Sequence, residues 1–461
     1  MRILLATLIV AFVAWPEVAC ADDPDGGRRW QAGDHHVHSE WSVDWDRSTS
    51  PPAPIRGGDS PYTRTRNARQ ALANGLSWMV HTDHGGPGHS VVTRDHAWPA
   101  LLQARQDVPA LIQFNGMEFD VPAGEHASLI IVPGPEERDQ LLAIERDYSR
   151  SEPLEPGTRD HGQQMLDALA HMRTLPSPPL MFINHPSRTA TGIGRWGQVE
   201  PAELRAWNDA APQVLVGMEG APGHQAASAH RGLYRNAAAP TFGGFDQMTA
   251  EIGGVWDTLL AEGRRFWITA TSDSHVNLRD GGRDFDPGQY SKTYVWARHE
   301  ATDIFDGLRN GRMFAVTGDL IDALELEVRA IDSTDRGARM GDTLSAPAGS
   351  MMRVELRVRQ PARPNANDQR PELHHIDLIV GSLGGHGAPR MQVKRFDSQD
   401  WKSEGQWRSL SWELQVPETG AFVRARGTNT PETTPQADVP GEDPWQDLWF
   451  YSNPVFVEVS R

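Results

Sequence analysis

The stretch RFWITATSDSH, residues 265–275, joins an apolar run to chemically active side chains at its end. Aromatic and β-branched residues in a short apolar run predict a buried strand. Asp273 and His275 follow that run. In α/β barrels the carboxyl ends of the strands converge on one mouth, where the active site is built. The stretch therefore predicts an α/β fold and the place of its site.

Similar apolar runs recur along the N-terminal two thirds of the chain, and several are separated by helical patterns. In one of these patterns, at 162–172, Met165, Leu166, Leu169 and Met172 fall on one predicted face. Strands that alternate with helices indicate parallel α/β packing. The expected strands are LSWMV (76–80), ALIQFNGM (110–117), ASLIIV (127–132), LMFIN (180–184), QVLVGME (213–219) and RFWITAT (265–271).

The pattern changes near Gly318. From about Leu320 onward, apolar and polar residues alternate in short runs, and no long helical pattern intervenes. This alternation predicts a smaller all-β, sandwich-like domain at 319–461, after a barrel domain at 22–318. The expected strands lie within 324–331, 351–360, 374–381, 409–416, 421–427 and 454–460.

The first residues form the pattern of a signal peptide. A basic start precedes an apolar run, and Ala19-Cys20-Ala21 has the small-x-small form of a cleavage site. We expect removal of residues 1–21, with cleavage after Ala21, and a periplasmic or secreted protein. A lipoprotein anchor on Cys20 is the alternative, and Glu17 is unfavourable for it.

Composition excludes several classes of protein. Cys20 is the only cysteine in the 461 residues, so after cleavage no disulfide, thiolate zinc site or cysteine nucleophile is expected. The formal net charge of −17 argues against nucleic acid or an anionic membrane as the main partner. No second apolar stretch approaches membrane-spanning length. A small molecule is the expected partner, and the oligomeric state is open.

Histidines and carboxylates occur where the predicted strands end. Asp34, His36 and His38 alternate, so an extended segment would direct all three to one face. Each such residue alone has an ordinary explanation, for example a half-buried histidine or a helix cap at Asp83. A single metal cluster explains them together. The other strand-end residues are His84, Glu118, Glu125, His126, His185, Asp273 and His275.

These residues carry a resemblance to a known family. The motifs GDHHVHS, TDHGG, NGMEFD, GEHAS, INHPSR and SDSH, in this order, resemble those of the PHP (polymerase and histidinol phosphatase) superfamily. The resemblance covers roughly 30–318 and implies a metal-dependent phosphoesterase on a distorted (β/α)7 barrel. The leader and β-rich tail look closer to secreted PHP-like proteins than to the polymerase-associated branch.

The resemblance also implies a centre of three divalent ions. One ion would bind His36, His38 and Asp273, and Glu118 would bridge it to a second ion held by His126 and His185. The third ion would bind His84, His275 and a residue from the loop after the first motif. Asp44 is the candidate for that residue, with Glu40 and Asp46 as competitors.

Imidazole and carboxylate ligands suit zinc, manganese or iron. We expect a metal-activated hydroxide to attack a phosphate mono- or diester. Arg188 is expected to bind a phosphoryl oxygen, with Arg195 and Lys292 as lesser candidates. His81 or His89 could protonate the leaving group. The tryptophans Trp41, Trp45 and Trp196 could stack a base or sugar, although packing is the commoner role.

Two other functions remain open from the sequence. An exported metallohydrolase of the amidohydrolase type could use a similar barrel on a non-phosphate bond. A metal- or ligand-binding protein without turnover is the second. The retained ligand pattern favours an enzyme. In the tail, His374 and His375 are adjacent in a predicted strand and face opposite sides, so no metal pair is expected there.

Overall fold

The computed structural model describes residues 26–153, 161–223, 234, 236–333, 336–385 and 387–460. The predicted leader, residues 1–21, lies outside the described residues, and its cleavage stays a prediction. None of the described helices is long and apolar enough to cross a membrane.

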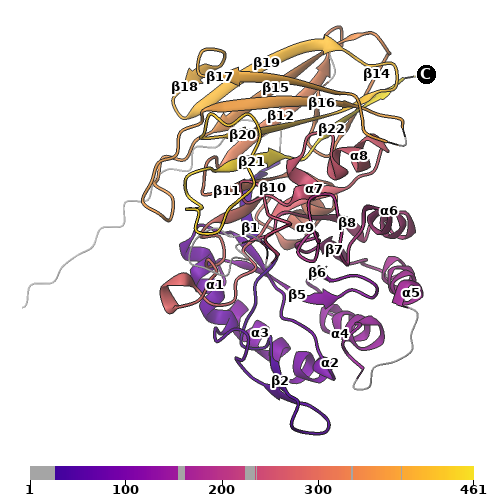
Figure 1. Ribbon diagram of the computed structural model, residues 1–461, viewed down its shortest axis with the longest axis vertical. Coiled ribbons are helices and arrows are strands. Elements are labelled where there is room, and N and C mark those ends of the chain that lie inside the picture. Colours follow the sequence, from indigo (N-terminus) through magenta and orange to yellow (C-terminus); the bar gives the residue numbers. More distant parts are fainter. Residues whose placement is uncertain are drawn as a thin grey trace, which may run out of the picture.

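The N-terminal part of the chain is a mixed α/β structure (Figure 1). Its strands belong to a large mixed sheet in which β10, β1, β4, β5, β6, β7, β8 and β9 lie side by side in that order. A two-stranded hairpin, β2 (Asp44–Asp46) with β3 (Ala53–Ile55), stands apart from this sheet. The strands of the sheet are β1 (Arg29–Asp34), β4 (Trp78–His81), β5 (Ile112–Asp120), β6 (His126–Ile131), β7 (Leu180–Ile183), β8 (Leu215–Ala221), β9 (Trp267–Ala270), β10 (Ser291–Ala297) and β11 (Met313–Thr317).

Every apolar run predicted as a strand in this part forms one, but the direction of one strand differs. β6 runs antiparallel to both β5 and β7, whereas parallel packing was expected. The cause is the short connection at 121–125, because a parallel neighbour needs a crossover of a dozen or more residues. β10 and β11 are also antiparallel to their neighbours.

Helices cover the outer side of this part of the sheet (Figure 1). In α5 the side chains of Met165, Leu169 and Met172 are buried as predicted, but Leu166 is 38% exposed, so its place on the buried face was wrong. The helices are α1 (Arg64–Ala73), α2 (His89–Val92), η1 (Thr93–Ala97), α3 (Trp98–Asp107), α4 (Glu137–Tyr148), α5 (His161–Arg173), α6 (Pro201–Ala210), α7 (Gln247–Ala250), α8 (Val255–Ala261), η2 (Leu278–Asp280) and α9 (Ala301–Arg309).

The predicted all-β region is confirmed, and it forms the orange-to-yellow half of Figure 1. A five-stranded sheet, β13-β12-β15-β19-β18, packs through an apolar core on strands of the large sheet. The strands of the region are β12 (Ala323–Ala330), β13 (Ala338–Arg339), β14 (Thr343–Ala346), β15 (Met351–Arg359), β16 (His375–Ser382), β17 (Met391–Asp397), β18 (Lys402–Glu404), β19 (Trp407–Gln415), β20 (Ala421–Thr428), β21 (Trp449–Ser452) and β22 (Val455–Val459).

The large sheet continues from the α/β part into the all-β region. β11 pairs antiparallel with β21, for example at Phe314 and Ser452. Gly318, where the domain boundary is predicted, has a φ of +58°, and a side chain there would overlap Leu448. The two parts therefore share one backbone hydrogen-bond network, while the boundary itself stays a prediction.

Within the α/β part, the last strand of the sheet, β9, lies near the strands at the other end of the strand order. The seam is defined here as the gap between β9 and the strands β1, β10 and β11. No strand of the described ranges forms a ladder with the outer edge of β9. Beyond the strand ends, Val37 and Ser274 form a single parallel bridge. The buried carboxylate of Asp34 accepts hydrogen bonds from the backbone N–H groups of His36 (3.1 Å) and Ser272 (3.2 Å). The seam therefore brings the first motif beside the last.

Candidate metal centre

Strand direction explains how distant motifs meet at one edge. β4, β5, β7, β8 and β9 deliver residues at or just beyond their carboxyl ends. β6 runs the opposite way, so its first residue, His126, pairs with Asp120 at the end of β5. Its position at the start of a strand, exceptional in the sequence, thus places it at the same edge as the others.

Glu118 lies at the centre of the cluster and is fully buried. Its Oε1 atom is 2.9 Å from Nε2 of His185, 3.0 Å from Nδ1 of His126 and 3.2 Å from Nε2 of His36. Its Oε2 atom is 2.7 Å from Nδ1 of His84. Nε2 of His38 is 3.5 Å from the same Oε2 atom, so one carboxylate lies beside five imidazoles from four motifs.

Asp273 joins the two histidines of the first motif. Its Oδ1 atom lies 3.0 Å from Nε2 of His36 and 3.1 Å from Nε2 of His38. The two imidazole nitrogens are themselves 3.0 Å apart. These ligand atoms are close enough together to bind one ion.

A further group lies nearer to solvent. Nε2 of His275 is 3.5 Å from Nε2 of His84, and Oδ2 of Asp59 is 3.1 Å from the first and 3.5 Å from the second. His38 belongs to the same group. The loop carboxylate beside His84 and His275 is therefore that of Asp59.

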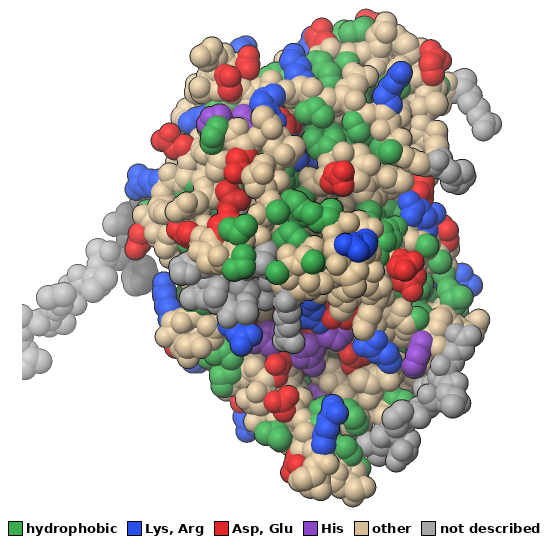
Figure 2. Space-filling view, viewed as in Figure 1, with side chains coloured by type: hydrophobic (Ala, Val, Ile, Leu, Met, Phe, Trp, Pro, Cys, Tyr) green, Lys and Arg blue, Asp and Glu red, His purple; other side chains and the backbone are tan. Residues whose placement is uncertain are grey.

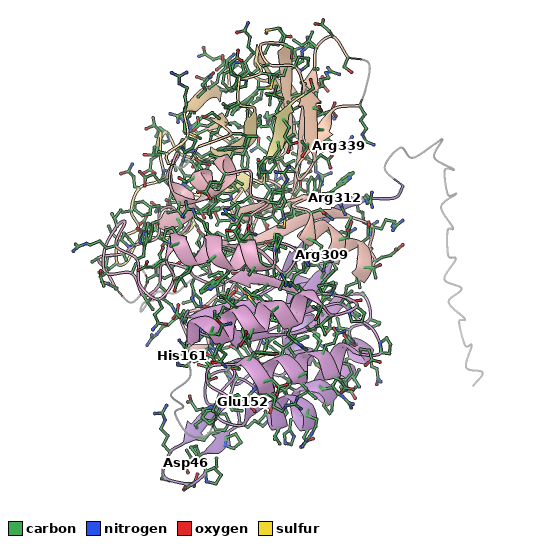
Figure 3. All side chains as sticks on the ribbon, turned by 90° about the vertical axis from the view of Figure 1, so that its right-hand side faces the viewer. Asp46, Glu152, His161, Arg309, Arg312 and Arg339 are labelled. Carbon is green, nitrogen blue, oxygen red and sulfur yellow. The ribbon has the colours of Figure 1, made fainter. Side chains whose placement is uncertain are left out.

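Asp44, predicted for that position, lies elsewhere. It is exposed on β2, where its backbone pairs with Ile55, and no candidate metal group of the described chain includes it. Asp46 lies at the end of the molecule remote from the β region (Figure 3), and Glu40 pairs with Arg56. The hairpin β2–β3 carries the chain away from the centre, so it returns only at Asp59. Sequence proximity to the first motif was the misleading signal.

Acidic residues hold the second nitrogen of several histidines. Glu219 contacts Nδ1 of His36 at 2.7 Å, Glu125 contacts Nδ1 of His185 at 3.0 Å, and Asp120 contacts Nε2 of His126 at 3.1 Å. Such contacts fix the imidazole orientation and tautomer in metal sites. Neither Glu219 nor Asp120 was predicted as part of the site, although both lie at strand ends on the same edge.

The carboxylates remain ionised despite burial. Burial raises the pKa of Glu118 and Asp273, but the surrounding histidines outweigh it and hold both values well below the ordinary range. Burial lowers the pKa of His126 and His275, yet their carboxylate neighbours raise both to about 10. The buried carboxylates are thus balanced by the charge of neighbouring histidines, and a divalent cation would take the place of the imidazole protons.

Two of the candidate ligands have strained backbones. His185 has a φ of 30° and Asp273 a φ of 47°, in a region that residues with a side chain rarely adopt. Strain of this kind persists where the surrounding structure enforces it, commonly at functional sites. Here the bond from the N–H of His185 to Glu219, at 2.6 Å, contributes to that enforcement.

The centre opens to solvent on one side. The side chains of His84, His275 and His126 are 26%, 21% and 14% exposed, while His36 and His185 are buried. Figure 2 shows histidine side chains gathered near the middle of one face, beside acidic and basic ones. A substrate would therefore approach from the side of the more exposed histidines.

Arg188 lies at this rim. Its guanidinium donates to Oε1 of Glu125 at 2.8 and 2.5 Å and lies 3.2 Å from Nδ1 of His126. The structure thus brings Arg188 to the centre, and its binding of a phosphoryl oxygen stays a prediction. Of the lesser candidates, Arg195 is exposed, and Lys292 is buried in an ion pair with Asp319 at 2.6 Å.

His81 and His89 do not face the centre. His81 contacts the amide of Gln113 at 3.0 Å, and that amide bonds to the backbone at the end of α3. Burial lowers the pKa of His81 to about 3. His89 lies between Glu145, at 2.7 Å, and the backbone oxygen of Trp41, at 2.9 Å. Their contacts indicate structural roles, in contrast to the predicted proton donation.

The tryptophans are mostly packed. His96 stacks on Trp41 with ring centroids 5.1 Å apart, and the guanidinium of Arg56 lies 4.6 Å from the Trp41 centroid, so a substrate ring would have to displace one of them. Trp45 lies against Gly86. In the tail, His374 and His375 contact each other through their Nδ1 atoms at 3.2 Å. They belong to no candidate metal group in the described ranges.

The donor set fits divalent cations. Oε2 of Glu118 and Oδ2 of Asp59 are buried atoms that have no well-formed hydrogen bond within the described part of the chain. Buried carboxylate oxygens without such bonds are costly unless a cation or proton satisfies them. Nitrogen and oxygen donors without sulfur suit zinc, manganese or iron.

An acidic group in the all-β region, formed by Asp438, Glu442 and Asp447, also has closely spaced carboxylates. Asp438 accepts bonds from the hydroxyl of Thr241 and the backbone of Gly243, so its charge is already satisfied within the protein.

Comparison with models of known protein families found no match for this chain, and neither did comparison with curated proteins.

Proposed function

We propose that this protein is a metal-dependent phosphoesterase that hydrolyses phosphate mono- or diesters at a three-ion centre. The supporting observation is the convergence of Glu118, Asp273 and six histidines from separate strand ends, with Asp59, into overlapping groups of ligand atoms. The order of the motifs makes the PHP superfamily the proposed family. The proposed fold is its distorted (β/α)7 barrel, closed at the seam. Export through the N-terminal leader remains part of the proposal.

The ligands divide among the ions according to their contacts. His36, His38 and Asp273 would hold the first ion, and Glu118 would bridge it to the second. His126 and His185 would complete the second ion, since both contact the same oxygen of Glu118. Asp59, His84 and His275 would hold the third ion, on the solvent side. This last set replaces Asp44 with Asp59.

Divalent ions at such a centre lower the pKa of water and neutralise charge on phosphoryl oxygens. The protein supplies orientation around them. Glu125 contacts both His185 and Arg188, so it fixes a candidate ligand and the rim guanidinium relative to each other. Arg188 would bind a phosphoryl oxygen, because guanidinium pairs with phosphate in a bidentate manner. Burial of the inner ligands excludes bulk water from all but the substrate side.

The test combines metal content with substrate class. Purified protein is assayed on chromogenic monoesters, diesters, amides and lactones, with elemental analysis of the same samples. We expect about three divalent ions per chain and hydrolysis of phosphate esters. Glu118→Gln should lose metal and turnover together, whereas Glu418→Gln, at an exposed position, should keep both. Hydrolysis of amides or lactones alone would overturn the phosphoesterase assignment, and absence of bound metal would overturn the centre.

A further inference from the structure

β9 carries Asp273 at its end, and its two edges are held in different ways. On one edge β9 forms a parallel ladder with β8, with Gly217 opposite Trp267 and Glu219 opposite Thr269. The other edge faces the seam, where no strand of the described chain continues the ladder. Backbone groups buried at such an edge need other partners.

Asn453, which follows β21 in the all-β region, supplies partners for Ile268. Its Oδ1 accepts from the N–H of Ile268 at 2.9 Å, and its Nδ2 donates to the carbonyl of the same residue at 2.9 Å. Nδ2 also donates to the carbonyl of Met313 in β11 at 3.1 Å. The side chain is fully buried. A carboxamide thus stands where a neighbouring strand would place a peptide group.

Thr293 supplies hydrogen-bond partners for Ala270, which is two residues closer to Asp273 than Ile268 is. Its Oγ1 accepts from the N–H of Ala270 at 2.9 Å and donates to the carbonyl of that residue at 2.8 Å. The hydroxyl is buried as well. Alternate residues of β9 are therefore satisfied by two side chains, one from β10 and one from the all-β region.

A buried ion pair joins the all-β region to the helix that precedes β9. Arg424 in β20 donates to both oxygens of Asp257 at 2.7 and 2.8 Å, and both side chains are fully buried. Asp257 belongs to α8, which directly precedes β9. The all-β region therefore contacts the chain immediately before β9 and along its free edge.

We propose that Asn453 is a positioning residue of the metal centre: it fixes the seam edge of β9 and so the placement of Asp273. The inference rests on the proposed three-ion centre. Asp273 follows Ala270 by three residues, has a strained backbone and bridges His36 and His38, so a small lateral shift of β9 would separate its Oδ1 from both histidines. The all-β region, on this basis, is a structural part of the centre.

The test compares Asn453→Leu with Asn429→Leu. Asn429 has the same kind of contacts, accepting from the N–H of Leu448 at 2.7 Å and donating to the carbonyl of Gln446 at 3.0 Å, but both lie within the all-β region. Hydrogen exchange on the metal-depleted proteins reports on β9 without any ion. We expect the Ile268 amide to exchange about tenfold faster in Asn453→Leu only, as loss of one hydrogen bond implies.

Zinc titration against a chromogenic chelator then measures the centre. Asn453→Leu should bind one of its zinc ions about tenfold more weakly, the usual effect of disturbing a residue that supports a ligand, and Asn429→Leu should match the parent protein. Because Asn453→Leu could prevent folding, Thr293→Val provides a second disruption of the same edge, and Thr293→Ser should restore zinc affinity by retaining the hydroxyl.

The outcomes separate the inference from the proposed function. Unchanged exchange at Ile268 and unchanged zinc affinity in folded Asn453→Leu would overturn the positioning role. Equal losses in the Asn429→Leu control would also overturn it, since they would indicate general destabilisation. A parent protein that binds zinc but hydrolyses no phosphate ester would overturn the proposed function alone. A parent protein that binds none of zinc, manganese and iron would overturn both.

Discussion

Oδ2 of Asp59 lies 3.1 Å from Nε2 of His275, although 215 residues of chain separate the two. The contact joins the loop after the first strand to the last motif of the α/β part. It places a carboxylate on the solvent side of the centre, where the inner ligands do not reach.

Replacing this carboxylate tests which aspartate completes the outer group. Asp59→Ala should reduce the metal content by about one ion per chain, since His84 and His275 alone give an incomplete set for a divalent cation. Asp44→Ala is the matched control and should keep the full content, because Asp44 is exposed on β2. Elemental analysis after gel filtration measures both. The reverse result would restore Asp44 as the ligand.

Glu219 should control metal affinity without binding metal. It contacts Nδ1 of His36 at 2.7 Å and accepts from the backbone of His185, so Glu219→Gln weakens the orientation of two ligands. We expect metal affinity to fall by about 10- to 100-fold. Chelator competition measures the change, and Glu418→Gln provides an exposed control. Equal affinities in the two variants would argue against the role of Glu219.

Arg188 should affect substrate binding more than metal binding. Arg188→Gln removes the guanidinium at the rim, and we expect kcat/KM for phosphate esters to fall about 10- to 100-fold, as for loss of a charged hydrogen bond. Inhibition by inorganic phosphate should weaken in parallel. Metal content should stay unchanged. Arg195→Gln, at an exposed position, serves as control and should retain parent kinetics.

His89 predicts a pH dependence of stability. Burial opposes its charge, but Glu145 and the backbone of Trp41 outweigh burial and raise the pKa of His89 from 6.5 to about 9. A raised folded pKa stabilises the protein fully below pH 6.5, and the contribution disappears as the pH rises through about 9. The stability difference between the parent protein and His89→Gln should therefore shrink by about 3 kcal/mol between about pH 6 and about pH 10.

Denaturant unfolding of metal-depleted protein at several pH values measures this difference. His299→Gln, at an exposed histidine, should show a small difference from the parent at every pH. A His89→Gln difference that stays constant with pH would indicate that His89 is neutral in the folded protein.

The strands of the α/β part were predictable because a short apolar run bounded by polar residues indicates a buried strand. Their directions were not, since the reversal at β6 depends on the short connection at 121–125. Glu118 and His185 could be predicted as site residues from their positions at strand ends, because a strand end fixes a residue to the edge of a sheet. Asp59 could not be predicted in this way, because it lies in a loop that returns to the centre after the hairpin β2–β3.

The contacts between side chains and backbone at the seam could not be predicted from the sequence either. Asn453 and Thr293 look like ordinary polar residues, and their roles appear only when β9 is known to lack a neighbouring strand. The separate all-β region was predicted from its alternating pattern. Its continuation of the large sheet through β11 and β21 was not, because a ladder between remote strands leaves no local mark in either strand.

That continuation has a practical consequence for dissecting the protein. A recombinant fragment that stops at Gly318 would lack β21, so the apolar strand β11, with the sequence MFAVT, would become an exposed edge of the sheet. Exposed edge strands pair with strands from other molecules. Such a fragment would tend to aggregate, so its inactivity would say nothing about the chemistry of the α/β part. Point variants in the intact chain are the sounder route.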